Sequence, residues 1–167
     1  QGFGPANATR RKLGYVMTDS SIRTAVTAWL SDATAAEATY GHISTWDTSG
    51  VTDMEQLFCD TIWAHTGRCY NSGAASFNED IGAWDTSGVT SMAEMFYRTS
   101  ICISCASAFN QDLGWCVAED VDLDDAFDGT SYTSCVSTSC GVTQGGCPTP
   151  APFSTPRPSL SLQPTTA

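Results

Sequence analysis

The chain has 167 residues, of which 15% are charged, and its formal net charge is −11. This length allows one modest domain with its own core, and the charged fraction is too low for a highly charged disordered chain. The negative charge argues against nucleic-acid binding, which requires Lys and Arg, and against binding to an anionic membrane surface. We expect no membrane insertion, because no stretch approaches the ~20 apolar residues of a membrane span.

Residues 1–17 are predicted to be an irregular N-terminal segment. Asn7 begins the sequence Asn-Ala-Thr, which is an acceptor for N-glycosylation. The basic cluster Arg10-Arg11-Lys12 follows it. This cluster could be a processing site, but its composition favours a solvated turn.

Residues 18–41 are predicted to form a helical N-terminal cap. The segment 18–32 has apolar residues on one helical face, and Asp19 or Ser20 can accept from the free N–H groups at its start. The small residues of 33–41 are expected to continue into a turn. The apolar face consists of Ile22, Val26, Trp29 and Leu30.

Residues 42–129 contain internal repeats. The string WDTSGVT occurs in HISTWDTSGVTDMEQLF (42–58) and again in DIGAWDTSGVTSMAEMF (80–96), and a diverged third copy is FNQDLGWCVAEDVDLDDAF (109–127). One such unit cannot bury its own apolar face, whereas stacked copies can. The sequence therefore predicts an α/β solenoid of about three coils. Its expected core residues are Trp46, Val51, Met54, Phe58, Phe77, Ile81, Trp84, Val89, Met92, Phe96, Phe109, Leu113, Trp115, Val121 and Phe127.

Each unit is predicted to run as a strand, a turn, a short α- or 3₁₀-helix and a loop. The segment Asp85 to Gly88 has turn chemistry, because Asp accepts from the N–H two residues later and Gly admits a positive φ. Residues 89–96 have helix-like apolar spacing. The recurrent Asn78 and Asn110 are expected to be buried amides that satisfy backbone groups.

Eight cysteines in a chain with few lysines favour an oxidised, secreted setting with disulfides. Their pairing stays open, because sequence cannot choose among the many possible connectivities. A zinc site is disfavoured, because the one C-x-x-C has no second such pair. The cysteines are Cys59, Cys69, Cys102, Cys105, Cys116, Cys135, Cys140 and Cys147.

The C-terminal part changes composition twice. Residues 130–147 are cysteine-rich and otherwise polar, and we expect a C-terminal cap held by disulfides. Residues 148–167 are rich in Pro, Ser and Thr, which favours an extended polyproline II tail and O-glycosylation. The candidate O-glycosylation sites are Thr149, Ser154, Thr155, Ser159, Ser161, Thr165 and Thr166.

The acidic run 119–129 resembles part of a calcium-binding loop. Asp120, Asp122 and Asp124 take the first, third and fifth ligand positions. The glycine expected next is Asp125, and the final Glu is absent. We therefore expect a solvated face of a coil and no cofactor other than covalent glycans, with calcium as the open alternative.

No residue is expected to be catalytic. Asp47 and Asp85 occupy equivalent positions in neighbouring repeats, which favours structural turns over an acid–base pair. The chain has no nucleophile motif and no phosphate-binding glycine loop. Trp63 lies outside the register of the repeat tryptophans and is the aromatic candidate for a surface contact.

The repeats resemble the BspA-like leucine-rich-repeat family, in the version built on FNxDIxxWDxSxVTxMxxMF. The match covers roughly 42–127, and the third copy departs from it at WCVAED, where the Asp-Thr-Ser turn is lost. The resemblance implies a right-handed leucine-rich-repeat-like solenoid and a secreted or cell-surface location. Members of that family are thought to mediate adhesion or matrix contacts, and the family has no known catalytic residues.

Two functions are compatible with these features. The first is a secreted structural glycoprotein that assembles with itself into an extracellular filament or matrix, because head-to-tail contact between solenoid ends need not close. The Pro-rich tail would add contacts to such a polymer. The alternative is a monomeric adhesion or ligand-binding module on a mucin-like stalk, which would hold a matrix protein or a polysaccharide.

Overall fold

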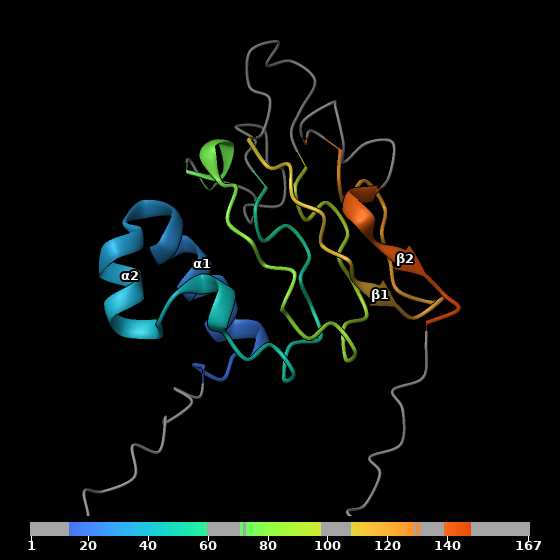
Figure 1. The fold of residues 1–167 in the computed structure, drawn as a ribbon, viewed down its shortest axis with the longest axis horizontal. Helices are drawn as coiled ribbons and strands as arrows, with labels where there is room; N and C mark the ends of the chain where they lie inside the picture. Colours follow the sequence, from blue (N-terminus) through green and yellow to red (C-terminus); the bar gives the residue numbers. More distant parts are fainter. Residues whose placement is uncertain are drawn as a thin grey trace, which may run out of the picture.

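The computed structural model describes residues 14–59, 71, 73–97, 108–128, 130 and 139–147. The helices α1 (Asp19–Ser31) and α2 (Ala33–Tyr40) lie at one side, and the repeat units follow in chain order (Figure 1). The strands β1 (Cys116–Val117) and β2 (Thr143–Gln144) pair in parallel at the opposite side. Three short 3₁₀-helices complete the order: η1 (Ile43–Thr45), η2 (Ala74–Ser76) and η3 (Ser139–Gly141). None of the helices in these ranges is long and apolar enough to cross a membrane.

The N-cap of helix α1 lies one residue before the first predicted capping residue. Thr18 is the N-cap, and its hydroxyl and that of Ser21 each accept from the other residue's backbone N–H. The expectation that Asp19 or Ser20 caps the helix is wrong, because the Asp19 carboxylate instead accepts from the backbone N–H of Thr52 at 2.7 Å. Residues 33–41 were expected to continue into a turn. Residues Ala33–Tyr40 instead form helix α2, which is capped by the Asp32 side chain.

The repeat units lie beside one another in parallel. Isolated bridges join Asp53 to Ser91 and Ser91 to Asp122, which occupy the same position in successive units. Alternate backbone N–H groups of each unit donate to carbonyls of the next, and we call this series the repeat ladder. Its donor–acceptor pairs are Met54–Ser91, Gln56–Ala93, Phe58–Met95, Met92–Asp122, Glu94–Asp124 and Phe96–Ala126, with N···O distances of 2.8 to 3.0 Å.

The predicted helix after each WDTSGVT-type turn is absent from the described units. The corresponding residues form turns, and Gln56, Glu94 and Asp125 have φ values of 59°, 54° and 52° at the same register. A residue in this left-handed region cannot continue a right-handed helix. The apolar spacing of these segments therefore reflects two tight turns that return their side chains to the core.

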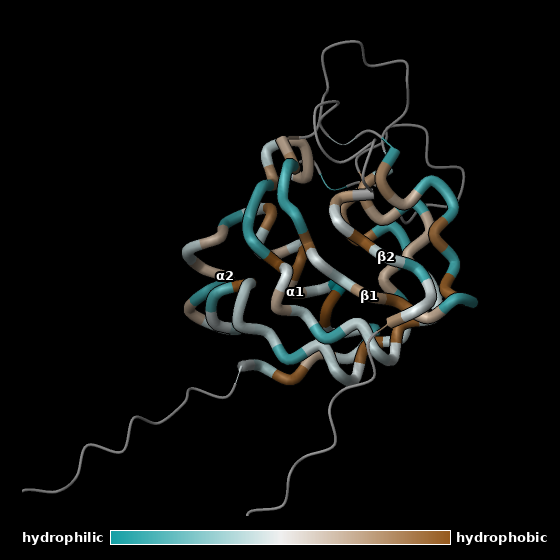
Figure 2. The backbone as a smooth tube through the Cα atoms, turned by 45° about the vertical axis from the view of Figure 1, so that its right-hand side comes forward, coloured by the Kyte–Doolittle hydropathy of each residue, from teal (hydrophilic) through white to brown (hydrophobic). Residues whose placement is uncertain are grey.

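Aromatic side chains form columns through the stacked units. The indole of Trp84 stacks on that of Trp46, with ring centroids 6.1 Å apart, and on that of Trp115 at 6.4 Å. Phe58 stacks on Phe96 at 5.0 Å. All the predicted core residues are buried except Phe127, which is half-buried at the edge of the last unit. Hydrophobic and hydrophilic stretches accordingly alternate along the units (Figure 2).

The segment 14–17 has no regular secondary structure, yet it joins the first unit. The Met17 N–H donates to the Asp47 carbonyl at 2.8 Å, and the Asp47 N–H donates to the Tyr15 carbonyl at 3.0 Å. The backbone of Gly50 approaches the Met17 carbonyl so closely that a Cβ would lie 2.9 Å from it. Gly50 and Gly88 do not have the positive φ that the sequence suggested, so close backbone approach explains the first of these glycines.

Disulfides are present in the described part of the chain. Cys116 in β1 is bonded to Cys147, which follows β2, with a Cα–Cα distance of 5.5 Å. Cys59 and Cys140 are also disulfide-bonded. Other candidate residues lie outside the described ranges: Cys69, Cys102, Cys105, Cys135, Trp63, Asn7 and all seven O-glycosylation candidates.

Candidate functional site: the two ends of the repeat ladder

The repeated aspartates serve turns. The Asp47 carboxylate accepts from the hydroxyl of Ser49 at 2.6 Å and from its backbone N–H at 3.1 Å. These two hydrogen bonds, the hydroxyl first, hold the pKa of Asp47 below its ordinary value. Asp85 accepts from the Ser87 N–H at 2.9 Å in the same way. The chemistry of both carboxylates is thus that of a backbone turn.

A second series of turns was missed by the sequence analysis. Asp53, Ser91 and Asp122 each accept from the backbone N–H two residues later, at 2.9, 3.3 and 3.0 Å. Asp122 was a candidate calcium ligand, and this turn is the role that the structure gives it. Among the described residues, no group of three or more His, Cys, Asp or Glu side chains is placed to hold a metal ion.

The recurrent asparagines lie on the surface. Asn78 and Asn110 are both exposed, so the expectation of buried amides is wrong. The Asn78 side-chain oxygen nevertheless accepts from the Asn110 backbone N–H at 2.9 Å. The Gln111 side-chain amide donates to the Asn78 carbonyl at 2.8 Å. These residues therefore join neighbouring units through hydrogen bonds made at the surface.

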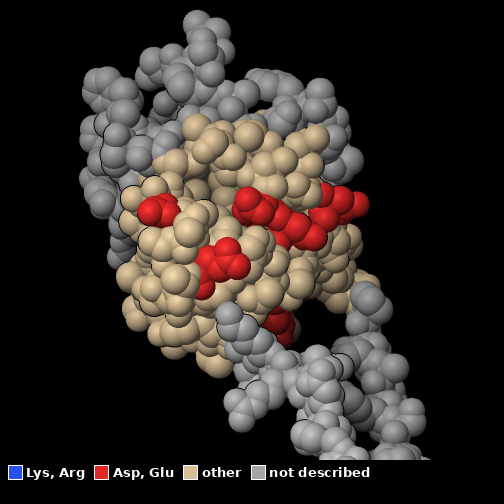
Figure 3. Space-filling model, turned by 60° about the vertical axis from the view of Figure 1, so that its left-hand side comes forward, with Lys and Arg blue, Asp and Glu red and all other residues tan. Residues whose placement is uncertain are grey.

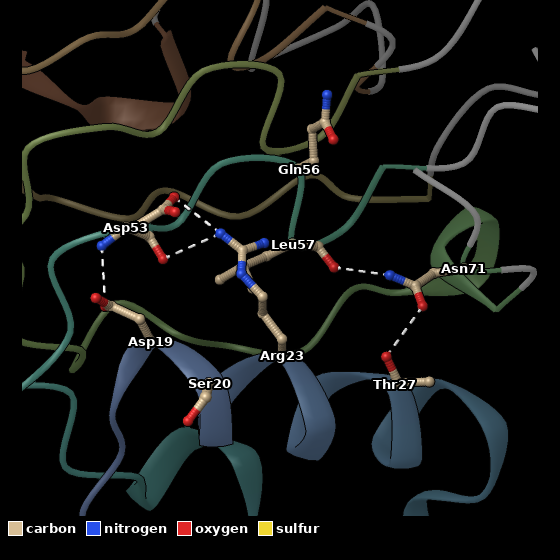
Figure 4. Close-up of a pocket in the computed structure, with 8 residues that line it drawn as sticks. All are labelled: Asp19, Ser20, Arg23, Thr27, Asp53, Gln56, Leu57 and Asn71. Carbon is tan, nitrogen blue, oxygen red and sulfur yellow. Dashed lines mark hydrogen bonds and ion pairs between the residues drawn. The ribbon is translucent and has the colours of Figure 1, made fainter. Parts of the chain in front are cut away.

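The first end of the repeat ladder presents carbonyl acceptors. The carbonyls of Asp53, Glu55 and Leu57 occupy the repeat positions equivalent to Ser91, Ala93 and Met95, whose carbonyls accept from the first unit. They lie on the side of the first unit away from the second unit. Side chains satisfy them in place of a preceding unit. Arg23 of α1 donates to the Glu55 carbonyl at 2.6 Å. Arg23 also donates to the Asp53 carbonyl at 3.5 Å, and Asn71 donates to the Leu57 carbonyl at 3.0 Å (Figure 4).

This end forms a polar groove of about 530 Å³ between α1 and the first unit. The Arg23 guanidinium also pairs with the Asp53 carboxylate at 2.8 Å, and the Thr27 hydroxyl holds Asn71 at 3.4 Å. The polar side chains of Arg23, Thr27 and Asn71 are paired across the groove, which therefore joins the helical cap to the repeats, whereas the Gln56 side-chain oxygen is buried without a hydrogen-bond partner in the described part of the chain. Its lining residues are Asp19, Ser20, Arg23, Thr27, Asp53, Gln56, Leu57 and Asn71.

Asp19 anchors the same joint. Burial acts to raise its pKa, but hydrogen bonds from the Thr52 N–H, the Asp53 N–H and the Thr52 hydroxyl together lower it below its ordinary value. These bonds measure 2.7, 3.1 and 2.9 Å. The ionised carboxylate therefore joins the first turn of α1 to the start of the first ladder segment.

The opposite end of the ladder presents N–H donors. Leu123, Asp125 and Phe127 occupy the repeat positions equivalent to Met54, Gln56 and Phe58, whose backbone N–H groups donate to the second unit. Within the described part of the chain, these three amides have no acceptor. The carbonyls of the same three residues accept from later N–H groups of their own turn. We call the amides of 123, 125 and 127 the donor edge.

The C-terminal strand covers only the first part of the third unit. β2 pairs with β1, and the Gln144 side-chain amide donates to the Glu119 carbonyl at 3.1 Å and the Val121 carbonyl at 2.7 Å. The strand covers 116–117 and the Gln144 side chain reaches the carbonyl of residue 121. The donor edge begins two residues later. The two ends of the ladder therefore differ: side chains satisfy the carbonyls of the first end, and the C-terminal strand stops short of the donor edge.

The donor edge is strongly acidic. Residues 119–128 contain no Lys or Arg, and six exposed carboxylates: Glu119, Asp120, Asp122, Asp124, Asp125 and Asp128. Arg23 is the only Lys or Arg in the described ranges, and it is paired at the other end. Figure 3, which turns the side of α1 and α2 toward the viewer, shows carboxylates on that face as well, and no basic side chain of the described residues is visible there.

The comparison with known families covers the repeat units. A family model described as "Mycoplasma protein of unknown function, DUF285" matches residues 34–138, which is more than half of the chain. No curated protein and no solved structure matches the sequence. DUF285 is a family of BspA-like repeats, so the resemblance predicted from the WDTSGVT units is confirmed at that level. The chain belongs to the DUF285 family.

Proposed function

We propose that this protein is a secreted, non-catalytic structural module that assembles with copies of itself into an extracellular filament or matrix. Its stacked units form a short right-handed leucine-rich-repeat-like solenoid in this proposal. The observation that carries it is the difference between the two ends of the repeat ladder. Arg23 and Asn71 occupy the acceptor end, whereas the donor edge has no acceptor in the described part of the chain.

Unpaired edge amides favour association. A row of unpaired N–H groups is a template on which another chain can pair, and soluble proteins usually cover or interrupt such edges. Here the edge is the last of a parallel stack, so a contact there continues the direction of the stack. Contact between two different surfaces of identical copies is heterologous and produces open polymers unless the rotation closes.

The disulfides support an extracellular setting for this assembly. The bond between Cys116 and Cys147 fastens the strand that covers the start of the third unit. Bonds of this kind persist in oxidising compartments and are rare in reducing ones. The aspartates of the units add support for a structural role, because Asp47, Asp53 and Asp85 are engaged in backbone turns.

Sedimentation velocity of the secreted protein with its disulfides intact tests the proposal. We expect the weight-average sedimentation coefficient to rise with protein concentration, and electron microscopy at the highest concentration to show elongated particles. A protein that stays monomeric at all concentrations would contradict self-assembly. That result would favour the alternative of a monomeric adhesion module.

A further inference from the structure

We propose that the donor edge is occupied by the basic N-terminal segment around Arg10-Arg11-Lys12 of a second copy, whose backbone carbonyls accept from the three amides. This inference rests on the proposed self-assembly and names the surface and the segment that would make it. The argument uses the backbone of the edge, its charge, and the place where the segment leaves the molecule.

The backbone of the edge selects a row of carbonyl acceptors. The amides of Leu123, Asp125 and Phe127 are spaced two residues apart, and their own carbonyls already accept hydrogen bonds within the unit. In the first unit, the equivalent amides donate to three carbonyls that are also spaced two residues apart, at Ser91, Ala93 and Met95. An added segment that follows the same backbone path would therefore supply its three carbonyls from about five residues, as backbone addition does at other open edges.

The charge of the edge selects a cationic segment. Asp124, Asp125 and Asp128 are exposed around the three amides, so an acceptor that is itself an anion is repelled. A peptide carbonyl accepts without a negative charge, and neighbouring Lys or Arg side chains would pair with the carboxylates. The chain has seven Lys and Arg residues, and Arg10-Arg11-Lys12 is their only consecutive run.

The segment leaves the molecule at the end opposite the donor edge. A Cβ on Gly14 would meet the carbonyl of Thr45 and lie 3.2 Å from the Asp47 nitrogen, so the chain enters the described structure against the first unit. The donor edge belongs to the third unit. In a row of copies with one orientation, the segment of one copy is placed beside the third unit of its neighbour, which is the heterologous geometry of an open polymer.

A charge-swap experiment tests this pairing. The triple variant R10E/R11E/K12E and the double variant D124K/D128K should each weaken self-association at least tenfold in sedimentation equilibrium at low salt. Mixing the two variants should restore association, because each then supplies the charge that the other lacks. The side chains of Asp124 and Asp128 are exposed and make no hydrogen bond or ion pair in the described part of the chain, so folding should be preserved.

A matched control separates this pairing from general charge effects. E37K/E79K makes the same change in net charge at two exposed carboxylates, one on α2 and one just before the second unit, where Glu79 lies 3.9 Å from the His42 ring nitrogen. This control should associate at least as well as the unaltered protein, since it lowers the net negative charge. Equal weakening by the control and by D124K/D128K would overturn the inference.

Amide hydrogen exchange gives a direct readout of the backbone contact. In assemblies quenched and dissolved for NMR, the amides of Leu123, Asp125 and Phe127 should exchange at least tenfold more slowly than in the monomer. The R10E/R11E/K12E variant should lose that protection at the same protein concentration. Protection already present in the dilute monomer would show an intramolecular contact and overturn the role of a second copy.

The outcomes separate this inference from the proposed function. Concentration-dependent association that is unchanged in both charge variants, with unprotected edge amides, would overturn the inference and leave self-assembly standing. Absence of any association in the unaltered protein would overturn both. Restored association in the mixture, together with protection at the three amides, would support both.

Discussion

Replacing Trp84 by Ala removes the middle member of the tryptophan column. The Trp84 side chain is 3% exposed and stacks between Trp46 and Trp115, with ring planes inclined by 14° and 13°. It also packs on Phe58 at 6.1 Å. Its indole N–H donates to the Ile43 carbonyl at 2.9 Å, so the residue combines burial, stacking and one buried hydrogen bond.

The magnitude follows from these contacts. Truncation of a buried aromatic residue to Ala costs about 3–5 kcal/mol, and loss of the indole hydrogen bond adds about 1 kcal/mol. The Ile43 carbonyl keeps its contact with the Trp46 N–H at 3.4 Å, which limits the second contribution. We expect the free energy of unfolding of W84A to fall by about 4–6 kcal/mol, a large share of the ~5–15 kcal/mol typical of a domain.

Urea unfolding with the disulfides intact measures this loss. The W115A variant is the matched comparison, because Trp115 is equally buried but stacks on Trp84 alone among the tryptophans. Its loss should be smaller by about 1 kcal/mol, the contribution of one aromatic pair. A decrease below about 1.5 kcal/mol for W84A would refute the view that the stacked column stabilises the units.

Three further perturbations test the capping joint and the C-terminal strand. R23Q should lower the free energy of unfolding by about 1–2 kcal/mol in urea, because it removes donors from two carbonyls, whereas T24A on the exposed side of α1 should change it by less than about 0.5 kcal/mol. The pKa of Asp19 is lowered in the folded state, so its stabilisation is present above the ordinary carboxyl pKa and is lost as pH falls through the folded value. Unfolding curves of D19N and the unaltered protein should therefore differ at neutral pH and converge in acid, and a constant difference would contradict this. The double variant C116A/C147A should lose about 3–4 kcal/mol by loop entropy, since the bond closes a separation of 31 residues; an unchanged urea midpoint would show that β1–β2 pairing alone holds the strand.

The repeated part of the fold was predictable from the sequence because its information is periodic. Trp46 and Trp84 are both followed by the same sequence, DTSGVT. A burial pattern inferred for one unit therefore predicted the buried residues at the equivalent positions of the other. In the diverged third copy, Trp115 still stacks on Trp84 although one residue is deleted before it. Core positions repeat because stacked units bury the same face, and that constraint is visible as identity between copies.

The conformation within a unit was not predictable in the same way. Gln56, Glu94 and Asp125 share a positive φ, but they share no residue type that would mark a left-handed turn. The apolar spacing around them fits a helix and a pair of tight turns equally well. The hydrogen bonds that the N–H groups of Gln56 and Glu94 make to the next unit decide between the two, and their acceptors, Ala93 and Asp124, are 37 and 30 residues away.

The residues of the candidate site could not be predicted from the sequence either. Arg23 lies on α1 among ordinary helix residues, and its partners Asp53 and Glu55 belong to the first unit. Asn71 is one of several polar residues between the first two units. Such residues act once, at an end, and therefore leave no periodic pattern.

The two ends of the ladder differ for a chemical reason. In this ladder, the first end presents the carbonyls of Asp53, Glu55 and Leu57, and the opposite end presents the donor-edge N–H groups. Long side chains with several donors can satisfy carbonyls, as Arg23 and Asn71 do here. N–H groups require acceptors, and the acidic side chains near the donor edge are short: Asp122 is engaged by the N–H of Asp124 within its own turn. The first end of the ladder is satisfied by the chain's own side chains, whereas the donor edge has no acceptor in the described ranges. This difference is what supports the proposed directional polymer, because contact between two different surfaces of identical copies need not close.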